Sequence, residues 1–177
     1  MIKCRNCKSY KLKKIIFIGK QVVSSIFPKT KSKISRKYSL DLYECKNCKL
    51  IQLGKSIPLG NMYGETYGYR SSLSKLMVNH LKDKFLKLKK LLKLKNKSNI
   101  LDIGSSDSTF LNFFSNEKKG YNCFGIDPSA EKYSKYYNKD VNLIVDYFSA
   151  KSVNSRLNSV NLKNKKFKLI SSFAMFY

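Results

Sequence analysis

Acidic residues, histidine and long apolar runs are all scarce in this sequence. Only 11 Asp and Glu stand against 36 Lys and Arg, and there is one histidine, His80. No stretch approaches the roughly 20 apolar residues that a bilayer-spanning helix needs. Met1–Cys4 opens without the apolar run of a signal peptide. The lack of long apolar runs argues against a membrane span, and the lack of a signal peptide argues against secretion. We therefore expect a cytoplasmic protein.

Cysteine is also rare, but its placement is informative. Four of the five cysteines form two Cys-x-x-Cys pairs, and Cys123 is left over. In a reducing compartment such pairs indicate metal ligands rather than disulfides. Four thiolates complete the tetrahedral shell of a closed, structural zinc site. An iron–sulfur cluster and a redox dithiol are the alternatives to zinc. Zinc is favoured because neither pair lies at a strand-to-helix junction that would activate a thiolate. The predicted ligands are Cys4, Cys7, Cys45 and Cys48.

Residues 1–60 predict a small zinc-binding ribbon. Short apolar strands at 15–18, 40–43 and 50–53 adjoin the cysteine pairs, and together they offer too thin a core without metal. Residues 61–97 follow as a tyrosine-rich connector and an amphipathic helix. The helix is predicted from leucines at three- and four-residue steps, a preceding serine cap, and lysines crowded into its last turn.

Residues 98–177 change to alternating strands and helices. This order predicts an α/β fold with a partial doubly wound, Rossmann-like parallel sheet, preceded by the zinc-ribbon module. The expected strands are 100–103, 123–126, 143–145 and 168–171, and the expected helices are 109–118 and 129–138.

A loop between the first of these strands and its helix has the shape of a nucleotide-cofactor loop. Gly104 permits a tight turn, and backbone N–H groups at such a place can hold a carboxylate or phosphate. Ser106 and Ser108 stand where glycine is usual, and a close-packed structural turn would look much the same. Asp127 ends the next strand, at the separation where an acidic residue meets ribose hydroxyls.

Three of the 11 acidic residues, Asp102, Asp127 and Asp146, end successive predicted strands. Each alone could cap a helix or turn. Together they predict a ligand site, because the carboxyl ends of parallel strands share one edge of a sheet.

The chain resembles the class I S-adenosylmethionine-dependent methyltransferases, and in particular the subgroup with an N-terminal zinc-binding domain. That subgroup includes C-methyltransferases acting on nucleotide-linked deoxysugars. The blocks that carry the resemblance are Cys4/Cys7, Tyr43–Leu53, Tyr67–Ser72 leading to His80, Asp102–Asp107, Gly125–Pro128 and Asp146–Phe148.

The resemblance implies S-adenosylmethionine and structural Zn²⁺ as cofactors, and methylation of carbon in a small acceptor such as a nucleotide-linked sugar. The tyrosines and arginine of the connector are candidates for the acceptor, or else form an aromatic hinge. The implied cofactor residues are Asp102, Gly104, Ser105, Ser106, Asp107, Asp127, Pro128, Asp146, Tyr147 and Phe148. The candidate acceptor residues are Tyr63, Tyr67, Tyr69 and Arg70.

In relatives, the sheet is completed and the general base supplied by a portion that would follow Tyr177, so we expect this chain to be the N-terminal part of the enzyme. His80 is expected on the polar side of its helix rather than as a base. The net charge of +25 would attract polyanions, but the lysines are spread along the chain. We therefore expect no nucleic-acid partner. A basic zinc-ribbon nucleic-acid-binding protein and an inactive remnant that binds zinc or cofactor stay open as alternatives.

Overall fold

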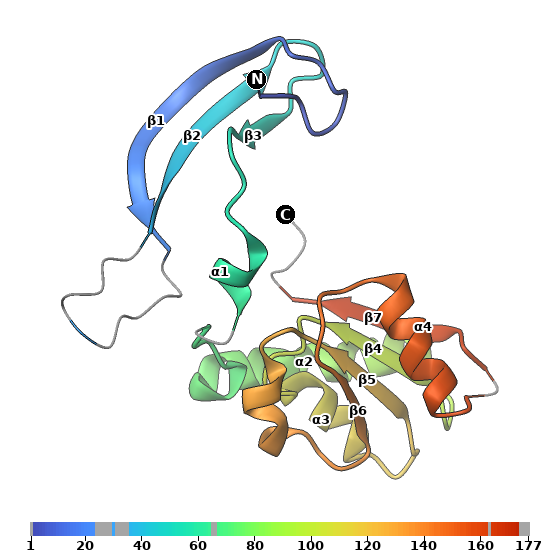
Figure 1. Ribbon diagram of the computed structural model, residues 1–177. Helices are drawn as coiled ribbons and strands as arrows, with labels where there is room; N and C mark the ends of the chain where they lie inside the picture. The colour runs from blue at the N-terminus through green and yellow to red at the C-terminus, as the bar shows by residue number, and fades with distance from the viewer. Residues whose placement is uncertain (1, 24–29, 31–35, 65–66, 163, 174–177) are drawn as a thin grey trace. The chain divides into compact units, whose positions relative to one another are not determined.

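The computed structural model describes residues 2–23, 30, 36–64, 67–162 and 164–173 (Figure 1). The chain divides into two compact units, residues 1–67 and 68–177. The first is a small antiparallel β unit, and the second is an α/β unit. Among the described residues, no helix combines the length and apolar character that crossing a bilayer requires.

A three-stranded antiparallel sheet makes up most of the first unit. It consists of β1 (Leu12–Val22), β2 (Lys37–Cys45) and β3 (Ile51–Leu53) in that order, and the short helix α1 (Leu59–Tyr63) follows. Each strand overlaps one of the three predicted apolar segments, and β1 and β2 extend several residues beyond theirs. Most side chains of β1 are exposed. The buried apolar side chains described in this unit are Cys4, Val23 and Cys45. Two of these three are predicted metal ligands, so the unit has almost no apolar core of its own.

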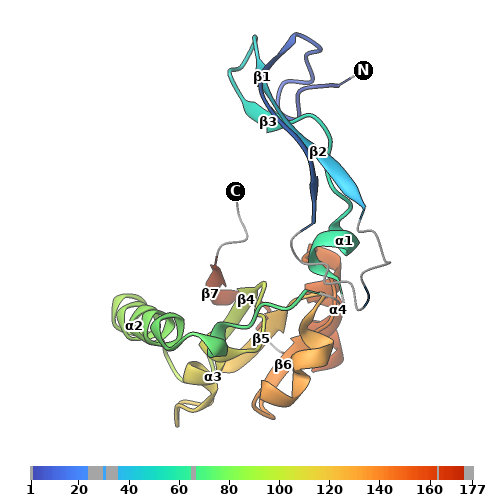
Figure 2. The ribbon, with the colours of Figure 1, turned by 90° about the vertical axis from the view of Figure 1, so that its left-hand side faces the viewer.

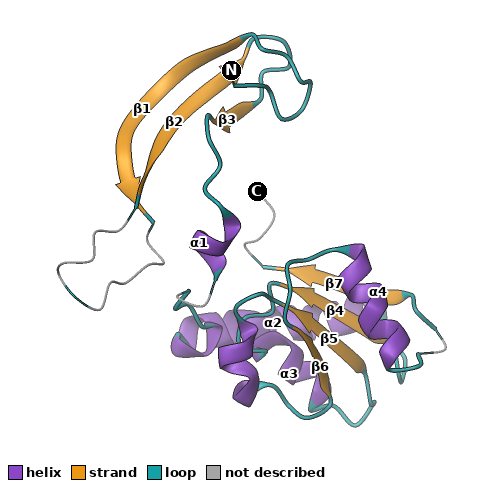
Figure 3. Cartoon of the chain, in the orientation of Figure 1, coloured by secondary structure: helices purple, strands orange, loops and turns teal. Residues whose placement is uncertain are grey.

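A four-stranded parallel sheet forms the centre of the second unit (Figure 3). Its order is β6-β5-β4-β7, so β4, the first of these strands in the chain, lies between β5 and β7. The sheet confirms the predicted α/β class and the four predicted strands. Their bounds are β4 (Asn99–Ile103), β5 (Asn122–Ile126), β6 (Val141–Ile144) and β7 (Phe167–Ser172).

Helices cover both faces of this sheet (Figure 2). On one face, Ile100 of β4 packs with residues of α2 (Lys75–Leu92) and α3 (Thr109–Ser115). On the other face, Leu101 and Ile103 pack against α4 (Ala150–Ser159). Since neighbouring residues of a strand point to opposite faces, one short apolar run supplies both cores.

The amphipathic helix α2 follows the short 3₁₀ helix η1 (Ser71–Leu73). The Ser74 hydroxyl caps it by accepting from the Met77 N–H at 3.3 Å, so a serine caps the helix, but it follows Leu73 rather than preceding it as predicted. Leu81 and Phe85 are its buried residues, one turn apart. The helix stops at Lys93, which adopts the left-handed conformation with φ of 44°.

Neither α1 nor η1 was predicted, and three further elements differ from the prediction. α3 ends at Ser115 rather than 118, because the N–H groups of Asn116 and Glu117 close turns onto Asn112 and Phe114. The predicted helix 129–138 is the 3₁₀ helix η2 (Ala130–Tyr136). α4 has no counterpart in the prediction, since its only buried residues are Val153 and Leu157, too few for a readable periodic pattern.

Candidate functional site

The two Cys-x-x-Cys pairs form two turns with the same backbone pattern. In the first, the Cys4 N–H donates to the Ser9 carbonyl at 2.8 Å, and the Lys8 N–H donates to the Cys4 carbonyl at 3.1 Å. In the second, the Cys45 N–H donates to the Leu50 carbonyl and the Lys49 N–H donates to the Cys45 carbonyl, both at 2.9 Å. Lys8 and Lys49 both have φ of 61°. Two equivalent turns thus present two sulfur atoms each.

The turns bring all four cysteines together. Their Sγ atoms all lie within 4.8 Å of one another. Sγ of Cys4 is 3.6 Å from that of Cys48, and Sγ of Cys7 is 3.5 Å from that of Cys45. A tetrahedral zinc with bonds of about 2.3 Å separates its sulfur ligands by about 3.8 Å. The four cysteines are therefore positioned to bind a metal, and these separations exclude disulfides among them.

The electrostatics of the cluster suit thiolate ligands. The Leu50 N–H lowers the pKa of Cys48 to about 6, against the effect of burial. Backbone N–H groups, that of Cys48 foremost, also lower the pKa of Cys45. For Cys7 the Ser9 N–H acts in the same direction, but burial and the neighbouring sulfurs raise the pKa to about 11. Four thiols this close cannot all ionise unless a cation compensates their charge, which is what a metal provides.

A buried glutamine attaches the first turn to the sheet. Gln52 of β3 accepts from the Arg5 N–H at 2.8 Å and donates to the Lys3 carbonyl at 3.1 Å. Arg5 also donates to the Leu53 carbonyl at 3.1 Å. These bonds hold the N-terminal segment beside β3 independently of any metal.

In the second unit, the loop after β4 contains three left-handed residues at alternate positions. Gly104, Ser106 and Ser108 have φ of 74°, 49° and 64°. A glycine-rich loop would use glycine at such positions, so the two serines adopt a glycine conformation at a steric cost. The Ser106 Oγ is also buried without a hydrogen-bond partner among the described residues.

Replacing Ser106 with glycine should stabilise the second unit by about 1 kcal/mol, because it relieves the left-handed strain and removes an unpaired buried hydroxyl. Some of that gain is offset by the greater freedom of glycine in the unfolded chain. Urea unfolding of Ser106→Gly measures the effect. Ser106→Ala is the matched control, since it removes the hydroxyl but keeps the strain. A glycine variant less stable than the alanine variant would contradict this description of the loop.

Asp127, directly after β5, holds this loop. Its Oδ2 accepts from the Ser106 N–H at 2.9 Å, and its Oδ1 accepts from the N–H and hydroxyl of Ser129, both at 2.7 Å. A carboxylate offers about four acceptor positions, so Oδ2 retains capacity for one more donor. The structure thus brings Asp127 and the Gly104–Ser108 segment together.

Asp102 lies inside β4 and is buried. Its Oδ1 accepts from the hydroxyl of Ser171 on the paired strand β7 at 2.8 Å. Burial raises the pKa of Asp102 to about 7, the Ser171 hydrogen bond opposes that rise, and the charge of Asp127 adds to it. Asp102 is thus a carboxyl group that is easily neutralised beneath the loop.

Asp107 is likewise buried, but its pKa shifts in the opposite direction. Burial acts to raise its pKa, but hydrogen bonds from Ser72 and Thr109 outweigh burial and lower it. The Ser72 N–H donates to Oδ2 at 3.0 Å, and the Thr109 hydroxyl donates to Oδ1 at 2.7 Å. Asp107 therefore attaches the segment before α2 to the loop.

The third predicted carboxylate, Asp146, follows β6 in the chain, and its side chain is exposed to solvent. It accepts from the Tyr147 N–H at 2.7 Å and from the Ser152 hydroxyl. Tyr147 and Phe148 are 38% and 49% exposed, so both rings are available to a ligand. Pro128 lies between Asp127 and Ser129 and is half-buried.

Two residues that the sequence prediction missed support the loop. The Tyr137 hydroxyl donates to the Ser106 carbonyl at 2.9 Å and shares a hydrogen bond with the Ser105 hydroxyl at 2.8 Å. A Cβ at Gly125 would lie 2.6 Å from the Ser105 Oγ, so glycine in β5 makes room for Ser105. Tyr137 is one of 12 tyrosines, and nothing in its sequence context distinguishes it.

The candidate acceptor residues fall in different units. Tyr63 and Tyr67 belong to the first unit, where their rings meet edge to face with centroids 5.4 Å apart. Tyr69 and Arg70 belong to the second. The Arg70 guanidinium lies 4.4 Å from the ring centroid of Tyr136 in η2. His80 is exposed on α2.

Comparison with known families matches the first unit. Residues 4–63 fit the family model named Methyltransf_13, described as "Putative zinc binding domain", and this span contains all four clustered cysteines. No curated protein matches the chain. The first unit is therefore similar to a zinc-binding domain whose family name points to methyltransferases.

Proposed function

We propose that this chain is the zinc-binding and cofactor-binding portion of an S-adenosylmethionine-dependent methyltransferase. In this proposal residues 1–60 are the zinc module, 61–97 a connector with its helix, and 98–177 the first part of a Rossmann-like cofactor domain. Two independent features support it: the methyltransferase-associated zinc-binding domain, and a parallel sheet whose first strand lies between the second and fourth. In such sheets, ligands bind outside the carboxyl ends of the strands.

The contact between Asp127 and the loop is the observation that carries the proposal. It joins the carboxyl end of β5 to the left-handed loop after β4, through the Ser106 N–H. Asp127 would bind the ribose hydroxyls of the cofactor through its remaining acceptor capacity. Three of its roughly four acceptor positions are already used, so Oδ2 would accept from one of the two ribose hydroxyls.

The other predicted cofactor residues would surround the same ligand. Asp102, Gly104, Ser105, Ser106 and Asp107 would shape the pocket for the methionine portion, while the exposed segment after β6 would border the adenine. When bound, S-adenosylmethionine would supply an electrophilic methyl group. The residues of this chain would hold and orient it and exclude water, which is catalysis by positioning.

We further propose that the acceptor is a small molecule of the nucleotide-linked sugar type. Arg70 supports this, because its guanidinium is stacked on Tyr136, and a pre-oriented guanidinium suits diphosphate recognition. Tyr69, which precedes Arg70 in the second unit, would contact the sugar. The metal would be structural, since four sulfur ligands leave no position for substrate.

Calorimetric titration of the chain with S-adenosylhomocysteine tests the proposal. We expect one site per chain, and affinity reduced roughly 10- to 100-fold in Asp127→Asn, since a hydrogen bond to a charged group is lost. Asp140→Asn, an exposed change in the same unit, is the control and should bind like the parent. A folded parent that gives no binding heat at any temperature tried, with no thermal stabilisation by the ligand, would reject the cofactor assignment.

A further inference from the structure

The C-terminal half of α2 presents lysine and leucine together on its exposed side. Leu86, Lys90 and Lys93 follow at steps of four and three residues, so they lie along one face. Lys87 and Leu91 continue that surface around the helix. Leu86 is 50% exposed and Leu91 is 76% exposed, whereas Leu81 and Phe85 of the same helix are buried.

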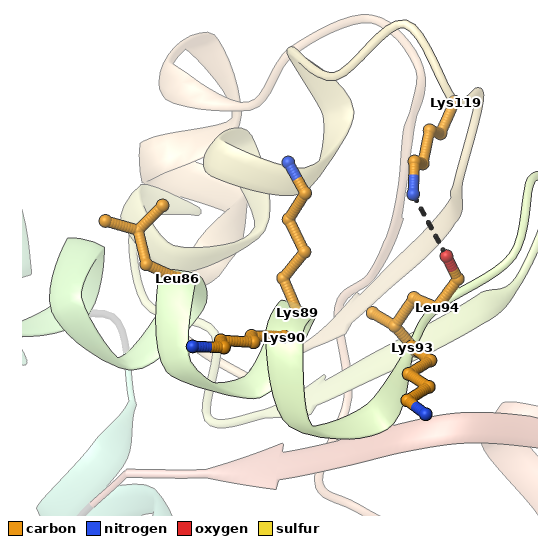
Figure 4. A pocket seen from close by; sticks show the side chains of 6 residues that line it. All are labelled: Leu86, Lys89, Lys90, Lys93, Leu94 and Lys119. Carbon is orange, nitrogen blue, oxygen red and sulfur yellow. Dashed lines mark hydrogen bonds between the residues drawn. The ribbon is translucent and has the colours of Figure 1, made fainter.

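A hollow of about 440 Å³ adjoins this face and is lined by four lysines and two leucines (Figure 4). Lys119 reaches it from the turn after α3 and donates to the Leu94 carbonyl at 3.2 Å. Lys89 is paired with Glu117 at 2.7 Å. Across the described part of the chain, the side chains of Lys90 and Lys93 make neither an ion pair nor a hydrogen bond, so two ammonium groups remain for an external anion. The lining residues are Leu86, Lys89, Lys90, Lys93, Leu94 and Lys119.

The combination of exposed leucines with unpaired lysines distinguishes between two anionic partners, a nucleic acid and a lipid surface. Lysines alone would suit the phosphate backbone of a nucleic acid, which makes no use of leucine. Exposed leucines beside unpaired lysines suit a lipid surface, where the leucines enter the boundary between headgroups and acyl chains and the lysines bind phosphate or carboxylate headgroups. Lysine stems can lie along the apolar surface while their ammonium groups stay in water.

We infer that this face of α2, with the adjoining hollow, is a peripheral contact for a membrane surface rich in anionic phospholipid. The contact is reversible, since a short amphipathic face buries little apolar area and its attraction is screened by salt. It lies on the face of the sheet that α2 and α3 cover, whereas α4 packs on the other face. It is independent of the proposed cofactor site.

Co-sedimentation of the full chain with vesicles tests the inference. The chain should bind vesicles of phosphatidylcholine with added phosphatidylserine, and should bind vesicles of phosphatidylcholine alone far more weakly. Lys90→Gln/Lys93→Gln should lower the partition coefficient roughly 10- to 30-fold, since each lysine near an anionic surface contributes independently. Leu86→Ser/Leu91→Ser should lower it by roughly 10-fold although the charge is unchanged.

The matched control is Lys151→Gln/Lys165→Gln, which removes the same charge from exposed positions on α4 and beside it, where Lys165 donates to Asn158. It should change the partition coefficient by less than about threefold, because α4 packs on the other face of the sheet and surface charges are screened. An equal loss in this control would overturn the inference in favour of diffuse charge. Nucleic-acid binding that is weakened by the α2 lysine changes but unaffected by the leucine changes, without vesicle binding, would overturn it in favour of a nucleic acid.

Discussion

Cys45→Ser should abolish stoichiometric zinc binding and unfold the first unit while leaving the second unit folded. The reason is that Cys4, Val23 and Cys45 are the buried apolar residues described in the first unit, so the metal replaces a core. Structural zinc sites contribute apparent binding free energies of about 10–16 kcal/mol, far more than one buried side chain. Metal analysis should give one zinc per parent chain and less than one tenth of that in the variant, and NMR should show the β1–β2 signals collapse.

Cys123→Ala is the control for this experiment, because Cys123 is a buried cysteine of the β5 strand remote in sequence from both pairs. It should keep full zinc content. Removing the metal from the parent with a strong chelator should reproduce the Cys45→Ser spectrum. If Cys45→Ser retained zinc and a folded β1–β2 hairpin, the four-cysteine site would not be what stabilises this unit.

Asp102→Asn should stabilise the second unit near pH 8 and flatten the dependence of its stability on pH. The pKa of Asp102 rises from 3.8 to about 7 on folding, mainly through burial. A raised folded pKa means that the folded state binds the proton more tightly. The associated stability is fully present below pH 3.8 and is lost as pH rises through about 7. A rise of this size corresponds to about 4 kcal/mol at alkaline pH.

Urea unfolding of parent and variant from pH 4 to 8 measures this effect, using probes in the second unit. The difference between the two free energies of unfolding isolates Asp102. Asp107, whose pKa is lowered, contributes in the opposite direction in both proteins. We expect the variant to be about 4 kcal/mol more stable than the parent at pH 8, with the difference vanishing towards acid. A constant difference across the range would show that Asp102 does not titrate with folding.

Much of the fold could be predicted because its signals are local. Ile100–Ile103 and Cys123–Ile126 are short apolar runs between turn residues, and such runs indicate buried parallel strands. The cysteine pairs predicted the metal cluster because two Cys-x-x-Cys turns can satisfy one tetrahedral ion. The structure confirms that the four sulfur atoms meet.

What escaped prediction depends on contacts distant in sequence. Tyr137 supports the loop from 31 or 32 residues away, through Ser106 and Ser105. Asp102 is buried and bonded to Ser171, 69 residues further along the chain, rather than simply closing a strand at an open edge. α4 is held by two apolar side chains against a sheet that supplies the rest of the contact. No local pattern encodes these arrangements, because each needs the assembled sheet.

The serines of the loop show how a sequence departure can leave the backbone unchanged. Ser106 and Ser108 replace the usual glycines, yet both adopt positive φ. The Asp127 carboxylate and the Tyr137 hydroxyl fix the backbone of Ser106 from two sides. These contacts offset the conformational cost of a side chain there, so Ser106 keeps a glycine-like backbone conformation without being glycine.

The most direct test of the cofactor assignment is amide chemical-shift mapping by NMR with S-adenosylhomocysteine. The account predicts saturable shifts concentrated in residues 104–108 and 127–129, with little change in the first unit's cysteine turns. Saturable shifts located elsewhere, or none at millimolar ligand, would show that Asp127 and the loop after β4 do not form an adenosyl-binding site.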